Sequence, residues 1–106
     1  MTPEGKVVAA IKREAKALGG DTRKVEWSGR RGAPDLLVLL PGMHFFIEAK
    51  APGEKPRPEQ LREHDRLRKA GIDVYVLDNV DSVKDFFECC ADALLLGLRS
   101  VMWLEK

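Results

Sequence analysis

Two carboxylates and a lysine, Asp35, Glu48 and Lys50, are the residues whose types and spacing best suit chemistry. Two carboxylates that lie close together repel each other, so one of them resists ionising unless a cation sits between them. A hard divalent cation with oxygen ligands relieves that repulsion, and Mg²⁺ or Mn²⁺ suits such a pair. Such a cation polarises a phosphoryl oxygen and lowers the pKa of a bound water. An adjacent lysine can orient that water or stabilise developing negative charge.

A pair of adjacent strands would have to position these groups. Pro34 cannot donate a hydrogen bond to a β-ladder and therefore suits the beginning of a strand. Residues 35–40 then form an apolar run, headed by one acid, that predicts a strand buried on both faces. Pro41-Gly42 is typical of a turn. Residues 43–50 follow as the next strand, which we expect to be antiparallel to the first because the connection is so short.

This hairpin predicts where the three charged side chains lie. Asp35 begins the first strand and Glu48 lies near the end of the second, so the two carboxylates should meet at one end of the hairpin. Side chains alternate along a strand, so Glu48 and Lys50 project from the same face. The backbone carbonyl of Ala49 lies between them and is a candidate for a further metal ligand.

The same residues also admit a plainer interpretation. Asp35 and Glu48 could cap strand ends while Lys50 pairs with one of them, and an acid followed by Glu-x-Lys is common by chance. The metal site is favoured because the carboxylates fall at adjacent ends of the predicted hairpin, after a basic loop. That loop, Gly29-Arg30-Arg31-Gly32, is either a solvated turn or a phosphate contact, and its position favours the phosphate contact.

The segment before this loop predicts a helix and a short strand. Thr2 suits a helix N-cap and Pro3 the first helical position. Apolar residues at helical spacing continue to Gly19-Gly20, which ends the helix. Glu4 in the first turn either interacts with the helix dipole or supplies a third carboxylate to the site. Residues 24–28 then alternate in polarity and predict a strand.

Beyond the hairpin, a loop with three prolines leads into a helix over 59–70. Leu61 and Leu67 are its expected core anchors. Gln60 and His64 share a face through their i, i+4 spacing. His64 either faces the site from this helix or is a solvated helix residue.

The C-terminal third completes the sheet and adds a last helix. Residues 73–77 predict a strand that a crossover places parallel to its neighbour. Ser82 and Asp85 match a capping box at the start of the following helix. The tail from Leu94 to Leu104 is strongly apolar, and it either returns to cover the sheet or meets a second copy of the chain.

Length and composition limit the class of protein. The 106 residues fit one domain, and a net charge of +1 provides no global field for nucleic acid. Local basic stripes beside an acidic site can nevertheless cancel in that sum. Cys89 and Cys90 are adjacent and cannot easily meet disulfide geometry, which suits a reducing cytoplasm. The sequence shows no signal-peptide pattern and no apolar run near the roughly 20 residues of a membrane span.

These motifs resemble those of the PD-(D/E)xK nuclease superfamily, with Pro34-Asp35 and Glu48-Ala49-Lys50 carrying the name motif. More closely, the chain resembles the VRR-NUC family, the virus-type replication-repair nucleases. The matching motifs are Arg30-x-Gly32-x-Pro34-Asp35-Leu36, Ile47-Glu48-x-Lys50 and the downstream Gln60. The resemblance covers nearly the whole chain and implies a single stand-alone domain over residues 1–106. It also implies an α/β fold of the restriction-endonuclease type, a mixed β-sheet flanked by α-helices in the order αβββαβα.

The resemblance implies roles for individual residues. Asp35 and Glu48 would bind Mg²⁺ or Mn²⁺ together with the Ala49 carbonyl. Glu4, which matches the acid of the family's first helix, would complete the site, directly or through water. Lys50 would serve the attacking water or the transition state, and the expected role of Gln60 is to position the lysine or a phosphate.

A function follows as an expectation. The residues predicted to contact DNA are Arg30, Arg31, Lys55 and Arg57. Stand-alone relatives resemble Holliday-junction resolvases, act as homodimers and occur in phages and other mobile elements. We therefore expect a metal-dependent, structure-selective DNA endonuclease that acts as a homodimer in the bacterial or phage-infected cytoplasm, without a membrane or small-molecule cofactor. The alternatives are restriction-like or exonuclease action on linear duplex, a non-catalytic junction-binding module, and a small assembly subunit that uses its apolar tail.

Overall fold

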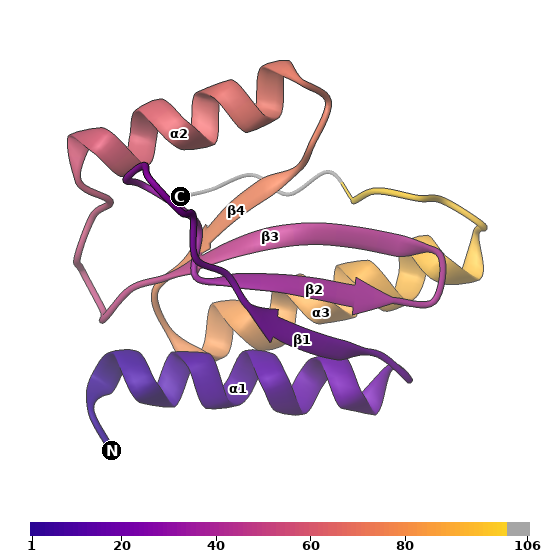
Figure 1. Ribbon diagram of the computed structural model, residues 1–106. Helices are drawn as coiled ribbons and strands as arrows, with labels where there is room; N and C mark the ends of the chain where they lie inside the picture. The colour runs from indigo at the N-terminus through magenta and orange to yellow at the C-terminus, as the bar shows by residue number, and fades with distance from the viewer. Residues whose placement is uncertain (102–106) are drawn as a thin grey trace.

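The computed structural model describes residues 1–101 and contains a mixed β-sheet with α-helices on both faces (Figure 1). The elements in chain order are α1 (Pro3–Ala17), β1 (Asp21–Lys24), β2 (Leu36–Leu40), β3 (Met43–Ala49), α2 (Pro58–Lys69), β4 (Val74–Leu77) and α3 (Val80–Leu95). This is the predicted αβββαβα order, and the predicted fold class is confirmed. No helix within residues 1–101 is long and apolar enough to cross a membrane.

The strands lie in the order β1-β2-β3-β4 across the sheet. β2 pairs with β1 and with β3 in antiparallel fashion, whereas β4 is parallel to β3. Both relations follow from the connections, because a two-residue turn can only reverse the chain and the α2 crossover returns it in the same direction. The register pairs Leu36 with Ile47. Asp35 therefore enters β2 opposite Glu48, as the hairpin prediction requires.

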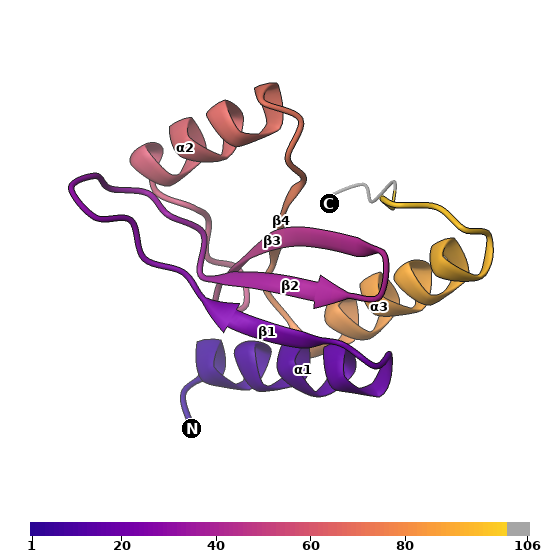
Figure 2. The same cartoon turned by 45° about the vertical axis from the view of Figure 1, so that its right-hand side comes forward.

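Two layers of helix cover the sheet unequally. α1 and α3 lie side by side beneath one face, and α2 lies over one end of the other (Figures 1 and 2). The face towards α1 and α3 carries the hydrophobic core, in which the ring centroids of Phe45 and Phe86 lie 5.3 Å apart. Alternate β2 residues are fully buried and half-buried. The prediction of a strand buried on both faces is wrong, because α2 covers only part of the second face.

α1 begins and ends where the sequence predicts, but the strand after it does not. The Thr2 hydroxyl accepts a hydrogen bond from the Gly5 N–H at 2.9 Å. Gly20 packs against the Leu39 carbonyl so closely that a β-carbon there would collide with it. The chain therefore pairs with β2 at once, and β1 spans 21–24 instead of the predicted 24–28.

α2 forms as predicted, yet its expected core anchors are wrong. Leu61 is 51% exposed, and Leu67 is only half-buried. The residues that α2 buries are Gln60, Glu63 and His64. The reason is its position, because α2 lies over the end of the sheet that carries Glu48 and Lys50 instead of over the apolar core.

α3 starts earlier than the capping-box prediction places it. Its N-cap is Asn79, whose side chain accepts a hydrogen bond from the Ser82 N–H at 2.8 Å. Ser82 therefore lies inside the first turn, because the chain leaves β4 and enters the helix almost directly. The face of α3 towards the sheet buries Val83, Phe86, Phe87, Cys90 and Ala93.

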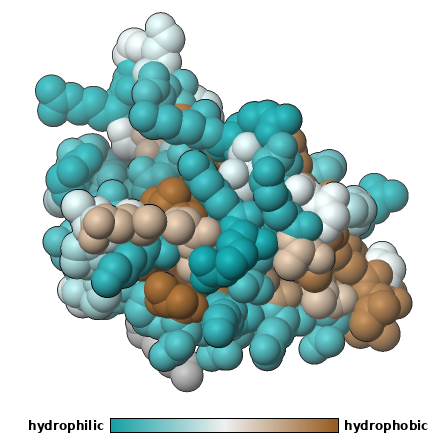
Figure 3. All heavy atoms as spheres, turned by 90° about the horizontal axis from the view of Figure 1, so that it is seen from below, coloured by the Kyte–Doolittle hydropathy of each residue, from teal (hydrophilic) through white to brown (hydrophobic). Residues whose placement is uncertain are grey.

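The end of α3 and the tail that follows it contain an exposed part and a packed part. Leu95, Leu96 and Leu98 are 86%, 75% and 51% exposed, and apolar surface gathers at the α3 end of the molecule (Figure 3). Val101 returns to pack against the core, and its carbonyl accepts a hydrogen bond from the Tyr75 hydroxyl at 2.7 Å. The remaining predicted tail residues, 102–104, lie outside the described residues.

Candidate active site

The hairpin brings Asp35 and Glu48 together at one end of the sheet. The Asp35 Oδ2 accepts a hydrogen bond from the Ala49 N–H at 2.8 Å, which ties the start of β2 to the end of β3. The two carboxyls also share a hydrogen bond. Glu48 is 1% exposed. The predicted carboxylates therefore lie close together, with Glu48 fully buried and Asp35 half-buried.

Burial and mutual repulsion make this pair reluctant to ionise. Burial, the hydrogen bond with Glu48 and the Glu48 charge together raise the pKa of Asp35 to about 6. Burial also raises the pKa of Glu48 above its ordinary value. Two adjacent acids with raised pKa values are what a desolvated pair shows in the absence of a counter-charge.

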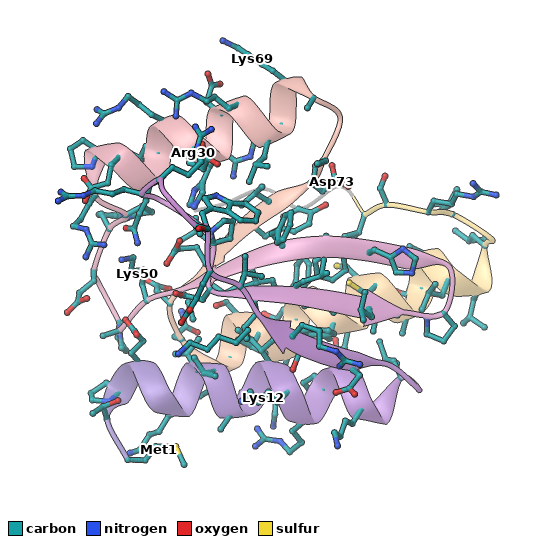
Figure 4. All side chains as sticks on the ribbon, in the orientation of Figure 1. Met1, Lys12, Arg30, Lys50, Lys69 and Asp73 are labelled. Atoms are coloured by element: carbon teal, nitrogen blue, oxygen red, sulfur yellow. The ribbon has the colours of Figure 1, made fainter. Side chains whose placement is uncertain are left out.

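Lys50 supplies part of that counter-charge. It is buried, and its positive charge lowers the pKa of both carboxyls. Figure 4 shows Lys50 beside the end of the sheet, between the levels of α1 and α2. The side-chain alternation predicted for β3 thus places the three charged groups within electrostatic reach of one another.

α2 adds two buried side chains to Glu48. The Gln60 Nε2 donates a hydrogen bond to the Glu48 Oε2 at 3.3 Å. Its Oε1 accepts from the Arg57 N–H at 2.8 Å, so the same amide caps the first turn of α2. The His64 Nε2 lies 3.2 Å from the Glu48 Oε1. Sequence reasoning left the direction of His64 open, although its spacing from Gln60 was the signal that both face Glu48.

The basic glycine loop is fastened to α2. The Arg30 Nη2 lies 2.9 Å from the Glu63 Oε1, and the same oxygen contacts the Arg66 Nη1 at 3.2 Å. Gly32 has φ +93°, and a β-carbon there would lie 2.5 Å from the Glu59 carbonyl oxygen. The Arg30-x-Gly32 motif therefore docks the loop that delivers Asp35 (Figure 4). Sequence reasoning missed Glu63, which looked like an ordinary charge on a solvated helix.

The other predicted DNA contacts are exposed around the start of α2. Arg31, Lys55 and Arg57 are all on the surface. The Arg57 Nε contacts the Glu59 Oε1 at 3.0 Å, and its charge also lowers the pKa of Glu48. The charge of Arg31 lowers the pKa of Glu59. Arg57 is therefore within electrostatic reach of the acid pair.

Glu4 approaches the pair without joining it. It is exposed in the first turn of α1, and its negative charge raises the pKa of Glu48. Within residues 1–101, no group of three or more His, Cys, Asp or Glu side chains is arranged to hold a metal ion. The carboxylates that the structure brings into contact are Asp35 and Glu48.

The donor set nevertheless fits a hard divalent cation. The N–H and C=O of one strand residue point to the same side, and the Ala49 N–H points at Asp35, so its carbonyl also faces that edge. Mg²⁺ keeps several waters and needs only one or two protein carboxylates. A cation would also relieve the repulsion that raises the pKa of Asp35 and Glu48.

A mixed sheet that presents two acids and a lysine where a β-hairpin ends defines a class of α/β phosphodiesterase domain. One solved structure, described as a VRR_NUC domain, is 47% identical with a TM-score of 0.79, covering 83% of this chain and 97% of that one. A protein of Acyrthosiphon pisum secondary endosymbiont phage 1, named "Putative nuclease p44", is 55% identical over 69 residues, which are 64% of this chain and 74% of the relative. No family model matches the chain. The chain belongs to the VRR-NUC family of nucleases, as its motifs indicated.

Proposed function

We propose that the chain is a deoxyribonuclease that hydrolyses phosphodiester bonds with the help of Mg²⁺ or Mn²⁺. The observation that carries this proposal is the Asp35–Glu48 pair beside Lys50, in which half-buried Asp35 and fully buried Glu48 both have raised pKa values. A domain that only bound DNA would gain nothing from burying two acids next to each other at the cost of their ionisation. The relative named as a nuclease supports the same class of activity.

Each residue has a role that its contacts support. Asp35, Glu48 and the Ala49 carbonyl would hold the cation, with Glu4 contributing through water. When bound, the cation would polarise a phosphoryl oxygen and lower the pKa of a water. Lys50 stabilises negative charge that develops on the phosphate, because its charge already acts on this corner of the sheet. Gln60 would act by holding Glu48, to which its amide donates.

The DNA backbone would approach across the start of α2. Arg31, Lys55 and Arg57 are exposed there and can contact phosphates. Arg30 is committed to Glu63, although its side chain is still 53% exposed and can offer its outer edge. DNA laid on this side meets the acid pair from the direction of the loop and α2.

For the substrate we propose branched DNA such as a Holliday junction, cut by a homodimer in the cytoplasm of a bacterial or phage-infected cell. The exposed leucines at the end of α3 and just after it offer a surface for a second copy. Two sites related by a two-fold axis would then cut two strands symmetrically. The relative from a phage supports the setting.

The test is cleavage of end-labelled four-way, flap and linear duplex DNA with Mg²⁺ or Mn²⁺. Wild-type protein should cut, and Lys50→Ala should reduce cleavage of every substrate. If wild type and Lys50→Ala leave all substrates equally intact, the nuclease proposal fails. Preferential cutting of linear duplex would instead support a restriction-like or exonuclease activity at the same site.

A further inference from the structure

The side chains that α2 buries are polar, and each has a partner. Burying a polar group costs free energy unless it is hydrogen-bonded. Glu63 meets two arginines, whereas Gln60 and His64 both meet Glu48. The packing of this helix is therefore built around the carboxylate that the proposed metal site needs.

Each oxygen of Glu48 has its own contact from α2. Gln60 donates to Oε2 at 3.3 Å, and the His64 Nε2 lies 3.2 Å from Oε1. His64 is 0% exposed and Glu48 1%, so solvent cannot take over either contact. A carboxylate held at both oxygens cannot rotate about its last bond. Each oxygen still has a lone pair free to face Asp35.

We propose that His64 is a positioning residue, which fixes the Glu48 carboxylate in the orientation that receives a divalent cation. This inference rests on the proposed function, because it assigns a partner to one of the proposed ligands. Groups that hydrogen-bond to metal ligands are worth about 10–100-fold in metal affinity or activity when they are removed. The geometry, one helical turn beyond Gln60 and directed at the opposite oxygen, gives His64 that place.

Three substitutions separate the hydrogen bond from packing. His64→Leu fills the space without a donor. The amide nitrogen of His64→Gln lies about as far along the side chain as Nε2, so it can still donate to Glu48. The amide of His64→Asn lies at the level of Nδ1 and falls short of Glu48. Val83→Ala, a buried change in α3 on the other face of the sheet, is the control for lost stability alone.

The measurement is Mn²⁺ affinity by isothermal titration calorimetry, with no DNA present. His64→Leu and His64→Asn should bind Mn²⁺ about 10–100-fold more weakly than wild type, and His64→Gln within about threefold of it. Val83→Ala should bind like wild type. Equal affinity in wild type and the three His64 variants, or His64→Gln as weak as His64→Leu, would overturn the inference. Should His64→Leu fail to fold, the Gln and Asn variants decide alone. Wild type that binds no Mn²⁺ would refute the metal-dependent function itself.

Discussion

Asp35→Asn should stabilise the metal-free protein while it removes activity. The Asn side chain retains an oxygen for the Ala49 N–H, and its amide can donate to Glu48. What the substitution removes is a negative charge that the folded chain accommodates poorly. The pKa of Asp35 is about 6, against an ordinary value of 3.8.

The sign and size of the effect follow from that pKa. The folded protein binds the Asp35 proton more tightly than the unfolded chain, so this group stabilises the fold below pH 4 and loses that contribution as the pH rises through about 6. A shift of about two units corresponds to roughly 3 kcal/mol as a ceiling. Partial exposure of the carboxyl screens the charge, so we expect about 1–2 kcal/mol in favour of Asp35→Asn above pH 7.

Thermal unfolding in EDTA at pH 4.5 and 7.5 tests this. Each kcal/mol should raise the Tm by about 4–8 °C in a chain of this size. The gain should be large at pH 7.5 and small at pH 4.5. Addition of Mn²⁺ at pH 7.5 should then stabilise wild type more than the variant, because wild type retains both proposed ligands. A variant that is no more stable than wild type at pH 7.5, or a gain of equal size at both pH values, would refute the reasoning.

Four further changes test other parts of the structure. Gly32→Ala should destabilise the fold by roughly 2–4 kcal/mol in urea unfolding, because φ is +93° and a β-carbon would lie 2.5 Å from a backbone oxygen; an unchanged midpoint would contradict the tight packing. Arg31→Ala should weaken DNA binding and reduce the salt slope by about one without loss of stability, as titrated by fluorescence anisotropy. Arg30→Ala should cost about 1 kcal/mol of stability, since Arg66 still pairs with Glu63. Leu95→Ser combined with Leu96→Ser should give a monomer by light scattering, and a monomeric wild type would contradict the dimer.

The sequence predicts the fold well where local signals are strong. The helix start at Thr2 and Pro3, the Pro41-Gly42 turn and the order of elements all follow from short-range chemistry. The position of β1 does not, because it depends on how tightly Gly20 packs against Leu39. A strand boundary of that kind is a tertiary property.

In the candidate site, too, local sequence predicts some features and tertiary packing decides others. The meeting of Asp35 and Glu48 could be predicted because a hairpin register relates residues that are close in sequence. The buried role of Glu63 could not, since a charge on a helix is usually solvated and only the folded loop reveals its partner. The prediction that Leu61 is a core anchor failed because the surface beneath α2 is polar. Helical periodicity locates an apolar stripe but does not say whether the neighbouring element offers it an apolar surface.

Because α2 packs through polar contacts, we expect it to be locally less stable than the rest of the molecule. α1, α3 and one face of the sheet share a hydrophobic core, whereas the fully buried side chains of residues 58–69 are Gln60, Glu63 and His64. Salt screens the ion pairs that Glu63 makes with two exposed arginines, and a buried hydrogen bond adds less net free energy than burial of a large apolar side chain. The amide protons of α2 should therefore exchange with solvent through partial openings that leave the core intact. Glu48 loses its two α2 partners in each opening, so the proposed active site is only as stable as this helix, whereas the hydrophobic core beneath it stays folded.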